Sequence, residues 1–132
     1  MLPSVPAGIG IDIIENERMQ KVLQRWGSKF KNRVFLPEEQ EYCESRSMPH
    51  IHYAVRFAAK EAVAKALHLG FGSTIRWRDI HIANNPSTGE PSVILKGITK
   101  NTATAMNIDT ILISLSHCHT HSIATAIAFQ KI

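Results

Sequence analysis

The sequence predicts a single domain of the α+β class. Segments in which apolar residues recur at helical spacing are interspersed with short β-branched runs bounded by Gly, Pro or Asn. The length of 132 residues suits one hydrophobic core and leaves little room for a second. The chain also has no internal repeat, low-complexity tract or linker. We therefore expect residues 1–132 to form one domain.

The first third of the chain predicts one strand followed by two helices. Residues 8–14 form a β-branched run bounded by glycine, which is typical of a strand. Residues 15–26 carry apolar side chains at helical spacing, and Gly27 provides a stop signal. A second, shorter helix is expected to begin at Pro37, because the next two residues are acidic and favour the positive end of a helix. That helix should end near Ser45.

The rest of the chain predicts one long helix and then mostly strands. The long helix is expected over residues 50–69, because alanine is a strong helix former and glycines follow this alanine-rich segment. The predicted strands lie near residues 77–83, 91–95, 110–116 and 122–129, with a turn at 84–89 and a weaker helix at 97–107.

The charge of the chain favours an anionic partner without identifying it. The 15 Lys and Arg residues outnumber the 11 Asp and Glu residues, which gives a net charge of +4 and a pI near 9.3. Nucleic acid, a phosphorylated small molecule and an acidic protein are all compatible with this excess. A small RNA-binding module would place exposed aromatic residues among the basic ones, whereas the aromatic residues here lie in apolar patterns. Nucleic acid is therefore kept only as an alternative.

The cysteines and the apolar segments indicate a cytoplasmic protein. Cys43 and Cys118 are too few for a disulfide scaffold and have no metal-binding spacing, so two reduced thiols are expected. No apolar run approaches the roughly 20 residues that a membrane-spanning helix needs. The apolar N-terminus lacks the basic region of a signal peptide. We expect neither a membrane segment nor a leader.

Asp12 is a lone carboxylate within an apolar strand. Burying a charge is costly unless the group is paired or binds a cation, so Asp12 is a candidate metal ligand. The alternative is a structural aspartate on the open face or at the end of the strand, where it caps the following helix. Its position alone does not decide between the two.

Glu61 and Lys65 lie four residues apart and share one face of the long helix. Such a pair is usually a surface ion pair that contributes about 0.2–0.5 kcal/mol. Here the pair lies among alanines and next to Arg56 and Lys60, which suits a site where Mg²⁺ and a polyphosphate meet. Asp12 is the natural second carboxylate, and the three basic residues are candidate phosphate ligands.

Three histidines follow the predicted strand at 110–116. In an extended segment His117, His119 and His121 would point to one side, which resembles a zinc site. No acidic or cysteine ligand accompanies them at a convincing spacing. We favour a phosphate contact for His117 and a solvated turn for His119 and His121.

Several segments together resemble the holo-acyl-carrier-protein synthases, the small bacterial group of 4′-phosphopantetheinyl transferases. GIGIDIIENERM is similar to that family's opening, and RFAAKEAVAKAL matches its most diagnostic stretch. WRDI, a turn similar to N-D-x-x-G-x-P, and SLSH follow in the expected order, so the resemblance covers nearly the whole chain. It implies helices packed on an antiparallel sheet, and a homotrimer with active sites at the subunit interfaces.

The resemblance also implies residue roles. Asp12 and Glu61 match the Mg²⁺ ligands, Lys65 matches a lysine that contacts the coenzyme A phosphates, and His117 matches a histidine near the coenzyme's phosphate. Arg18 and Arg25, seven residues apart, match basic positions that meet the acidic recognition helix of the carrier protein.

The chain departs from the family in two places. Where the family often has a Lys/Arg-rich stretch before its arginine, only Arg46 is available here for a phosphate contact. In the turn, Asn85-Pro86 replaces the usual acidic step, which bears on the adenine contact.

The activity implied is transfer of the 4′-phosphopantetheine group from coenzyme A to a serine of apo acyl carrier protein. The reaction releases 3′,5′-ADP and serves fatty acid biosynthesis. Catalysis is expected to come from Asp12, Glu61 and Lys65, with either Glu61 or a water oriented by Asp12 as the general base. The alternative within the same fold is a catalytically inactive carrier-binding protein.

Overall fold

The computed structural model describes residues 4–132, so the part of the expected domain formed by residues 1–3 lies outside the described residues. The chain follows an α+β order, as predicted. Its elements are β1 (Ser4–Glu15), α1 (Asn16–Trp26), α2 (Ser28–Val34), α3 (Pro37–Glu44), α4 (Pro49–Ala66), the 3₁₀ turn η1 (Trp77–Asp79), β2 (Ile80–Asn84), β3 (Pro91–Leu95), α5 (Gly97–Ala105), β4 (Ile108–His117) and β5 (His121–Lys131).

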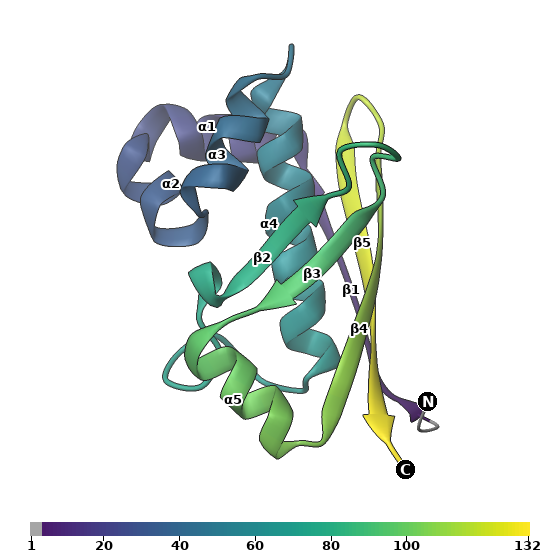
Figure 1. Ribbon diagram of the computed structural model, residues 1–132. Helices are drawn as coiled ribbons and strands as arrows, with labels where there is room; N and C mark the ends of the chain where they lie inside the picture. The colour runs from purple at the N-terminus through teal and green to yellow at the C-terminus, as the bar shows by residue number, and fades with distance from the viewer. Residues whose placement is uncertain (1–3) are drawn as a thin grey trace.

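The strands form two antiparallel sheets. The larger has the order β1-β5-β4 and places Asp12 opposite Ala124, while β2 and β3 form a separate hairpin. Helix α4 runs along the larger sheet, α1 to α3 gather near one end of α4, and α5 lies toward the other end (Figure 1). Helices packed on an antiparallel sheet are therefore confirmed. Within residues 4–132, no helix has both the length and the apolar character needed to cross a membrane.

The structure differs from the predicted elements mainly at α2. This seven-residue helix has little apolar periodicity, but its Phe30 packs against Phe35 and Phe57 with ring centroids 6.0 Å apart in both cases. Its conformation is thus supported by tertiary contacts rather than by a local pattern. The segment at 77–83 also begins as a 3₁₀ turn, and β1 extends four residues before the predicted start at Gly8.

Small residues let α4 approach the sheet closely. Buried alanines of α4 face buried alanines of β5, and β1 contributes Gly8 and Gly10 to this contact. A Cβ atom on Gly10 would lie 1.9 Å from the Ala62 carbonyl oxygen, and one on Gly8 equally close to that of Ala66. Main chain therefore touches main chain where β1 crosses α4.

Replacing Gly10 by alanine is expected to destabilise the protein by about 3 kcal/mol, because the added methyl overlaps backbone that cannot move aside without displacing α4. Urea unfolding followed by circular dichroism measures this change. Gly72→Ala is the matched control, since a Cβ there meets nothing within 4 Å, and we expect a change below about 0.5 kcal/mol. Equal stabilities of the two variants would contradict the close contact.

A buried ion pair connects the helices to the β2–β3 hairpin. Lys60 and Glu39 have fully buried side chains, and the Lys60 Nζ lies 2.8 Å from the Glu39 Oε1. Lys60 also donates to the carbonyl oxygens of Val34 and Trp77 at 2.9 and 3.0 Å. Glu39 accepts the backbone N–H groups of Leu36 and Ile82, so neither side chain lacks partners.

Candidate functional site

A cavity of about 370 Å³ lies where β1, α1 and α4 meet. It brings together Asp12 from β1, Arg18 from α1, and Glu61 and Lys65 from α4. The remaining lining is mostly apolar, including Met19, Val22, Phe30 and Phe57. The structure therefore places in one cavity the three residues predicted to carry catalysis, together with one predicted docking arginine.

Lys65 reaches across from α4 to β1. Its Nζ lies 3.2 Å from the Asp12 Oδ1 and donates to the Ile11 carbonyl oxygen at 2.8 Å. Asp12 is largely covered whereas Lys65 is about half exposed, so this ammonium group faces both the carboxylate and solvent. An anion that enters the cavity would therefore meet the Lys65 ammonium group at the edge of the cavity.

Glu61 lies in an environment that disfavours a second negative charge. Partial burial raises the pKa of Glu61, the negative charge of Asp12 raises it further, and Lys65 opposes both effects. Two carboxylates with too little positive charge between them favour a divalent cation or a proton. Because Mg²⁺ commonly takes one or two carboxylates and completes its shell with water and phosphate oxygens, this pair fits Mg²⁺.

A second cluster of candidate residues lies around Tyr42. The Arg56 guanidinium carbon is 4.1 Å and that of Arg46 5.4 Å from the Tyr42 ring centroid. The His52 ring meets Tyr42 edge-on at 5.9 Å and His117 edge-on at 5.8 Å. The cluster therefore joins α3, α4, the loop between them and the end of β4 into one cationic and aromatic surface.

The Tyr42 cluster and the Asp12–Glu61 cavity lie on different sides of α4. Arg56 and Glu61 are five residues apart, which is about 140° around a helix, and His52 and Glu61 are about 180° apart. One copy of the chain thus presents the carboxylates and the Tyr42 cluster in different directions. The sequence-based grouping of Arg56 around Glu61 is wrong in this respect.

Lys60 is also removed from the candidate coenzyme-binding residues. Its side chain is fully buried and gives its hydrogen bonds to Glu39, Val34 and Trp77. Burial lowers the pKa of Lys60, although the Glu39 carboxylate opposes this effect. A phosphate cannot reach this ammonium group, so Lys60 acts in the core.

The three histidines at the β4–β5 turn are not arranged as a three-ligand metal site. His119 and His121 are exposed, and the Nδ1 atom of His121 lies 2.9 Å from the Thr120 hydroxyl oxygen. Across residues 4–132 no group of three His, Cys, Asp or Glu side chains is arranged to hold a metal ion. The zinc alternative is therefore not supported, while His117 belongs to the Tyr42 cluster.

Two residues of the Tyr42 cluster, Tyr42 itself and His52, were not identified as site residues from the sequence, and neither was Asn84, which contacts Arg56. His52 precedes Arg56 by four positions, so helical spacing from a candidate arginine was an available signal. Asn84, whose Oδ1 accepts a hydrogen bond from Arg56, gave no such signal because it lies 28 residues away on β2. The predicted docking residues Arg18 and Arg25 are exposed on α1.

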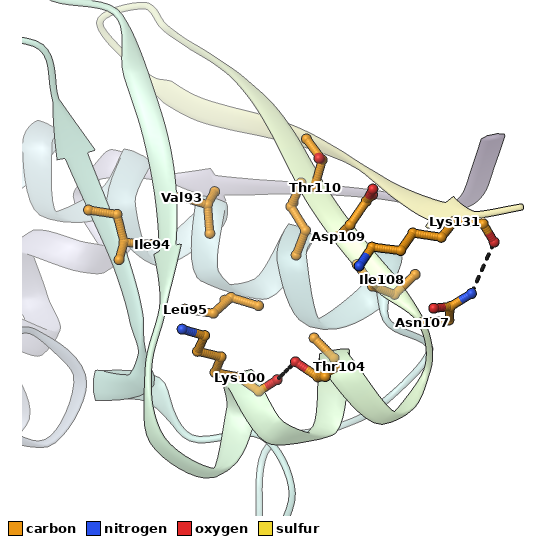
Figure 2. A pocket seen from close by; sticks show the side chains of 12 residues that line it. Val93, Ile94, Leu95, Lys100, Thr104, Asn107, Ile108, Asp109, Thr110 and Lys131 are labelled. Carbon is orange, nitrogen blue, oxygen red and sulfur yellow. Dashed lines mark hydrogen bonds between the residues drawn. The ribbon is translucent and has the colours of Figure 1, made fainter. Parts of the chain in front are cut away.

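A larger cavity, of about 560 Å³, lies between β3, α5 and β4 (Figure 2). Its lining combines apolar side chains of the two strands with Lys100, Asp109 and Lys131. None of the predicted site residues lines it. The larger of the two cavities is therefore not the one that contains the residues suited to phosphate chemistry.

Comparison with known proteins gives one consistent result. Residues 8–126 match the model of the 4′-phosphopantetheinyl transferase superfamily. The holo-[acyl-carrier-protein] synthase of Protochlamydia amoebophila is 46% identical over 120 residues, which cover 91% of this chain and 95% of that protein. That of Chlamydia muridarum is 41% identical over 92% of this chain and 93% of its own length.

Solved structures agree with these sequence relatives. The holo-[acyl-carrier-protein] synthase from Neisseria meningitidis has a TM-score of 0.87 at 28% identity, covering 94% of this chain and 98% of that one. The Helicobacter pylori protein, solved in complex with coenzyme A, has a TM-score of 0.80 at 32% identity, covering 91% and 98%. The likeness therefore extends over the whole fold.

Proposed function

The chain belongs to the 4′-phosphopantetheinyl transferase superfamily, and from this premise we propose that it is a holo-[acyl-carrier-protein] synthase. It transfers the 4′-phosphopantetheine group of coenzyme A to a serine of apo acyl carrier protein and releases 3′,5′-ADP, in support of fatty acid biosynthesis. The observation that carries this function is the convergence of Asp12, Glu61 and Lys65 on one cavity. Two relatives named holo-[acyl-carrier-protein] synthase, which this chain matches over 95% and 93% of their length, support the same function.

We further propose that Asp12 and Glu61 hold Mg²⁺. When bound, this cation would offset the charge of the coenzyme A diphosphate and polarise the phosphorus that is attacked. Lys65 would exchange its contacts with Asp12 and Ile11 for phosphate oxygens and stabilise the departing 3′,5′-ADP. A Glu61 carboxylate oxygen that does not hold the cation would accept the proton of the carrier serine.

The apolar lining of the cavity supports this course. Met19, Val22, Phe30 and Phe57 limit the access of water next to the carboxylates, which strengthens the electrostatic interactions that stabilise the transition state. The serine hydroxyl then competes with less water for the phosphorus. The proposal thus assigns charge stabilisation to Lys65, proton acceptance to Glu61 and exclusion of water to the apolar wall.

The proposed enzyme is a homotrimer whose active sites lie between subunits. The outer face of β1 exposes Ile9, Ile11 and Ile13 by 71%, 55% and 60%, and β4 exposes Leu112 by 55%. Alternate residues of a strand share one face, so these isoleucines form an apolar strip that a second copy can cover. Because the carboxylates and the Tyr42 cluster face different ways, one coenzyme can use both only across such an interface. Light scattering should give the mass of three 14.7 kDa chains.

We place the enzyme in the cytoplasm. Cys43 is buried and Cys118 exposed, and both are free thiols, which accords with a reducing compartment. Apo acyl carrier protein and coenzyme A are the proposed partners.

The decisive experiment is an adduct assay. Purified protein is incubated with apo acyl carrier protein, coenzyme A and Mg²⁺, and the carrier is examined by intact-mass spectrometry. The expected result is a carrier that gains one phosphopantetheine group, together with 3′,5′-ADP, and that stays unmodified when the metal is chelated. An unmodified carrier under conditions in which a known transferase is active would refute the function.

Docking of the carrier is expected to depend on the basic face of α1. Arg25→Glu should raise the KM for the carrier by about fivefold and weaken its salt dependence, because one attractive charge becomes repulsive. The kcat at saturating carrier should stay near that of the wild type. Lys100→Glu on α5 makes the same charge change on an exposed residue and should leave KM unchanged. Equal KM changes in the two variants would place docking elsewhere.

A further inference from the structure

We propose that His52 is a further substrate-binding residue, which contacts the 3′-phosphate of coenzyme A as a protonated imidazole. This inference rests on the proposed function. It adds His52 to the proposed coenzyme-binding residues and predicts that a proton is taken up when coenzyme A binds. It is carried by the position of His52 within the Tyr42 cluster, which consists of Tyr42, Arg46, His52, Arg56 and His117.

His52 lies in the middle of this cluster. Its ring is 5.9 Å from that of Tyr42, at 80°, and 5.8 Å from that of His117, at 68°. Tyr42 in turn lies beneath Arg56. Edge-to-face contacts on both sides fix the imidazole plane, so His52 has less orientational freedom to lose when a ligand binds.

Arg56 provides independent evidence that the Tyr42 cluster binds an anion. It is only 3% exposed, yet its Nε donor has no hydrogen-bond partner. Among residues 4–132 it is the one buried side-chain nitrogen or oxygen atom in this condition. The fully buried ammonium group of Lys60, by contrast, has three acceptors. A buried guanidinium donor without an acceptor is unusual, and a ligand oxygen or a water that enters beside it would complete its hydrogen bonds.

The charged groups that lower the pKa of His52 most are positive or become positive on protonation. They are Arg56 and His50 from α4, Arg46 from the loop before α4, and His117 from β4. Burial is the largest cause that lowers the pKa of His52, and these groups lower it further. His52 is therefore neutral in the free protein at neutral pH.

A bound phosphate reverses this balance. A dianion within the cluster favours the charged imidazole and raises the pKa of His52, so binding takes up a proton. The affinity gained through His52 then increases as the pH falls from the pKa of the complex to that of the free protein. At pH values above the pKa of the complex the contribution disappears.

The position of the cluster assigns it to the 3′-phosphate. Coenzyme A carries a diphosphate and one phosphate monoester, and the proposed Mg²⁺ pair, Asp12 and Glu61, suits the diphosphate. Within one subunit His52 is about 13.5 Å from Glu61 along α4 and on its opposite side, so the cluster cannot share a diphosphate with the carboxylates of its own subunit. The largest charge effects on the pKa of His52 come from Arg56, Arg46, His117 and His50, none of them a carboxylate. The positively charged side chains of the Tyr42 cluster can therefore bind the 3′-phosphate monoester without a metal ion.

The experiment compares coenzyme A with dephospho-coenzyme A, which lacks only the 3′-phosphate. Dissociation constants are measured by isothermal titration calorimetry from pH 5.5 to 8.5, in pairs of buffers with different ionisation enthalpies to count protons. The variants are His52→Phe, which keeps an aromatic ring, and His52→Gln, which keeps a hydrogen-bond donor. His119→Gln, on the exposed turn, is the control, and circular dichroism verifies folding.

At pH 6 both His52 variants should bind coenzyme A about tenfold more weakly than the wild type, and at pH 8.5 within about twofold. They should take up fewer protons on binding, and their affinity for dephospho-coenzyme A should be unchanged. Equal losses for the two ligands, or an unchanged pH dependence, would overturn the role of His52 while leaving the transferase activity intact. Failure of the wild type to bind coenzyme A at any pH would overturn the proposed function as well.

Discussion

Replacing Glu61 by glutamine is expected to lower the kcat of phosphopantetheine transfer by about three orders of magnitude without unfolding the protein. The change keeps the shape of the side chain but removes both a negative charge from the Asp12–Glu61 pair and the carboxylate that we propose as the proton acceptor. Loss of a general base alone typically costs 10²–10⁴-fold in rate, and weaker binding of the cation adds to this loss. We therefore expect the largest catalytic effect at this position.

The fold should tolerate the substitution. Within residues 4–132, no hydrogen bond or ion pair joins the Glu61 side chain to another residue, and the side chain is only partly buried. Because removal of the carboxylate also relieves repulsion from Asp12, the melting temperature should stay the same or rise slightly.

The measurement is single-turnover and steady-state adduct formation, followed by mass spectrometry, with thermal unfolding on the same samples. Glu38→Gln, at an exposed position of α3, makes the same chemical change away from the cavity and should retain wild-type turnover. Calorimetric titration with Mg²⁺ should show weakened binding only in the Glu61 variant. Turnover within threefold of the wild type would exclude Glu61 from the reaction.

Replacing Lys60 by methionine is expected to lower the free energy of unfolding by about 3–5 kcal/mol. Methionine fills most of the volume of the lysine but leaves the Glu39 carboxylate buried without its cation. The carbonyl oxygens of Val34 and Trp77 also lose a donor. An uncompensated buried charge is among the few causes of such a large effect from a single substitution.

A double variant separates charge from packing. Glu39→Gln combined with Lys60→Met removes both charges. The glutamine amide oxygen can still accept a hydrogen bond from one of the two backbone N–H groups that donate to Glu39 in the wild type. It should be more stable than Lys60→Met alone, which gives a coupling energy between the two positions.

Urea unfolding of the four proteins of this cycle provides the measurement. Lys100→Met, at an exposed position of α5, is the matched control and should change stability by less than about 0.5 kcal/mol. If Lys60→Met were as stable as the wild type, the ion pair would be dispensable for folding.

Patterns local to one segment predicted much of the fold. The alanine-rich segment at 50–69 corresponds to α4 (Pro49–Ala66), and the predicted strands correspond to β2 to β5 within a few residues. The short helix α2 was missed because its support comes from the aromatic contacts of Phe30 with Phe35 and Phe57. The spacing of residues within one segment cannot predict contacts with other segments.

The candidate site was predictable where the residues share one element or one motif. Glu61 and Lys65 lie on one helix face, and Asp12, 49 positions earlier, is a lone carboxylate in an apolar strand that the family resemblance matches to a Mg²⁺ ligand. Lys60 was misjudged because its partner, Glu39, is 21 residues away, and a lysine within a helix is usually a surface residue. The separation of Arg56 from Glu61, by contrast, follows from helix geometry and was available from spacing alone.

The contact between β1 and α4 has a consequence for protein engineering. Gly10 lies two residues before Asp12, and Ala62, whose carbonyl oxygen Gly10 approaches, directly follows Glu61. The spacing of the two acidic groups is thus set by polypeptide backbone, independently of the residues that select substrates. The proposed carrier-docking surface on α1 and the proposed nucleotide site around Tyr42 can therefore be redesigned without disturbing the distance between the two carboxylates.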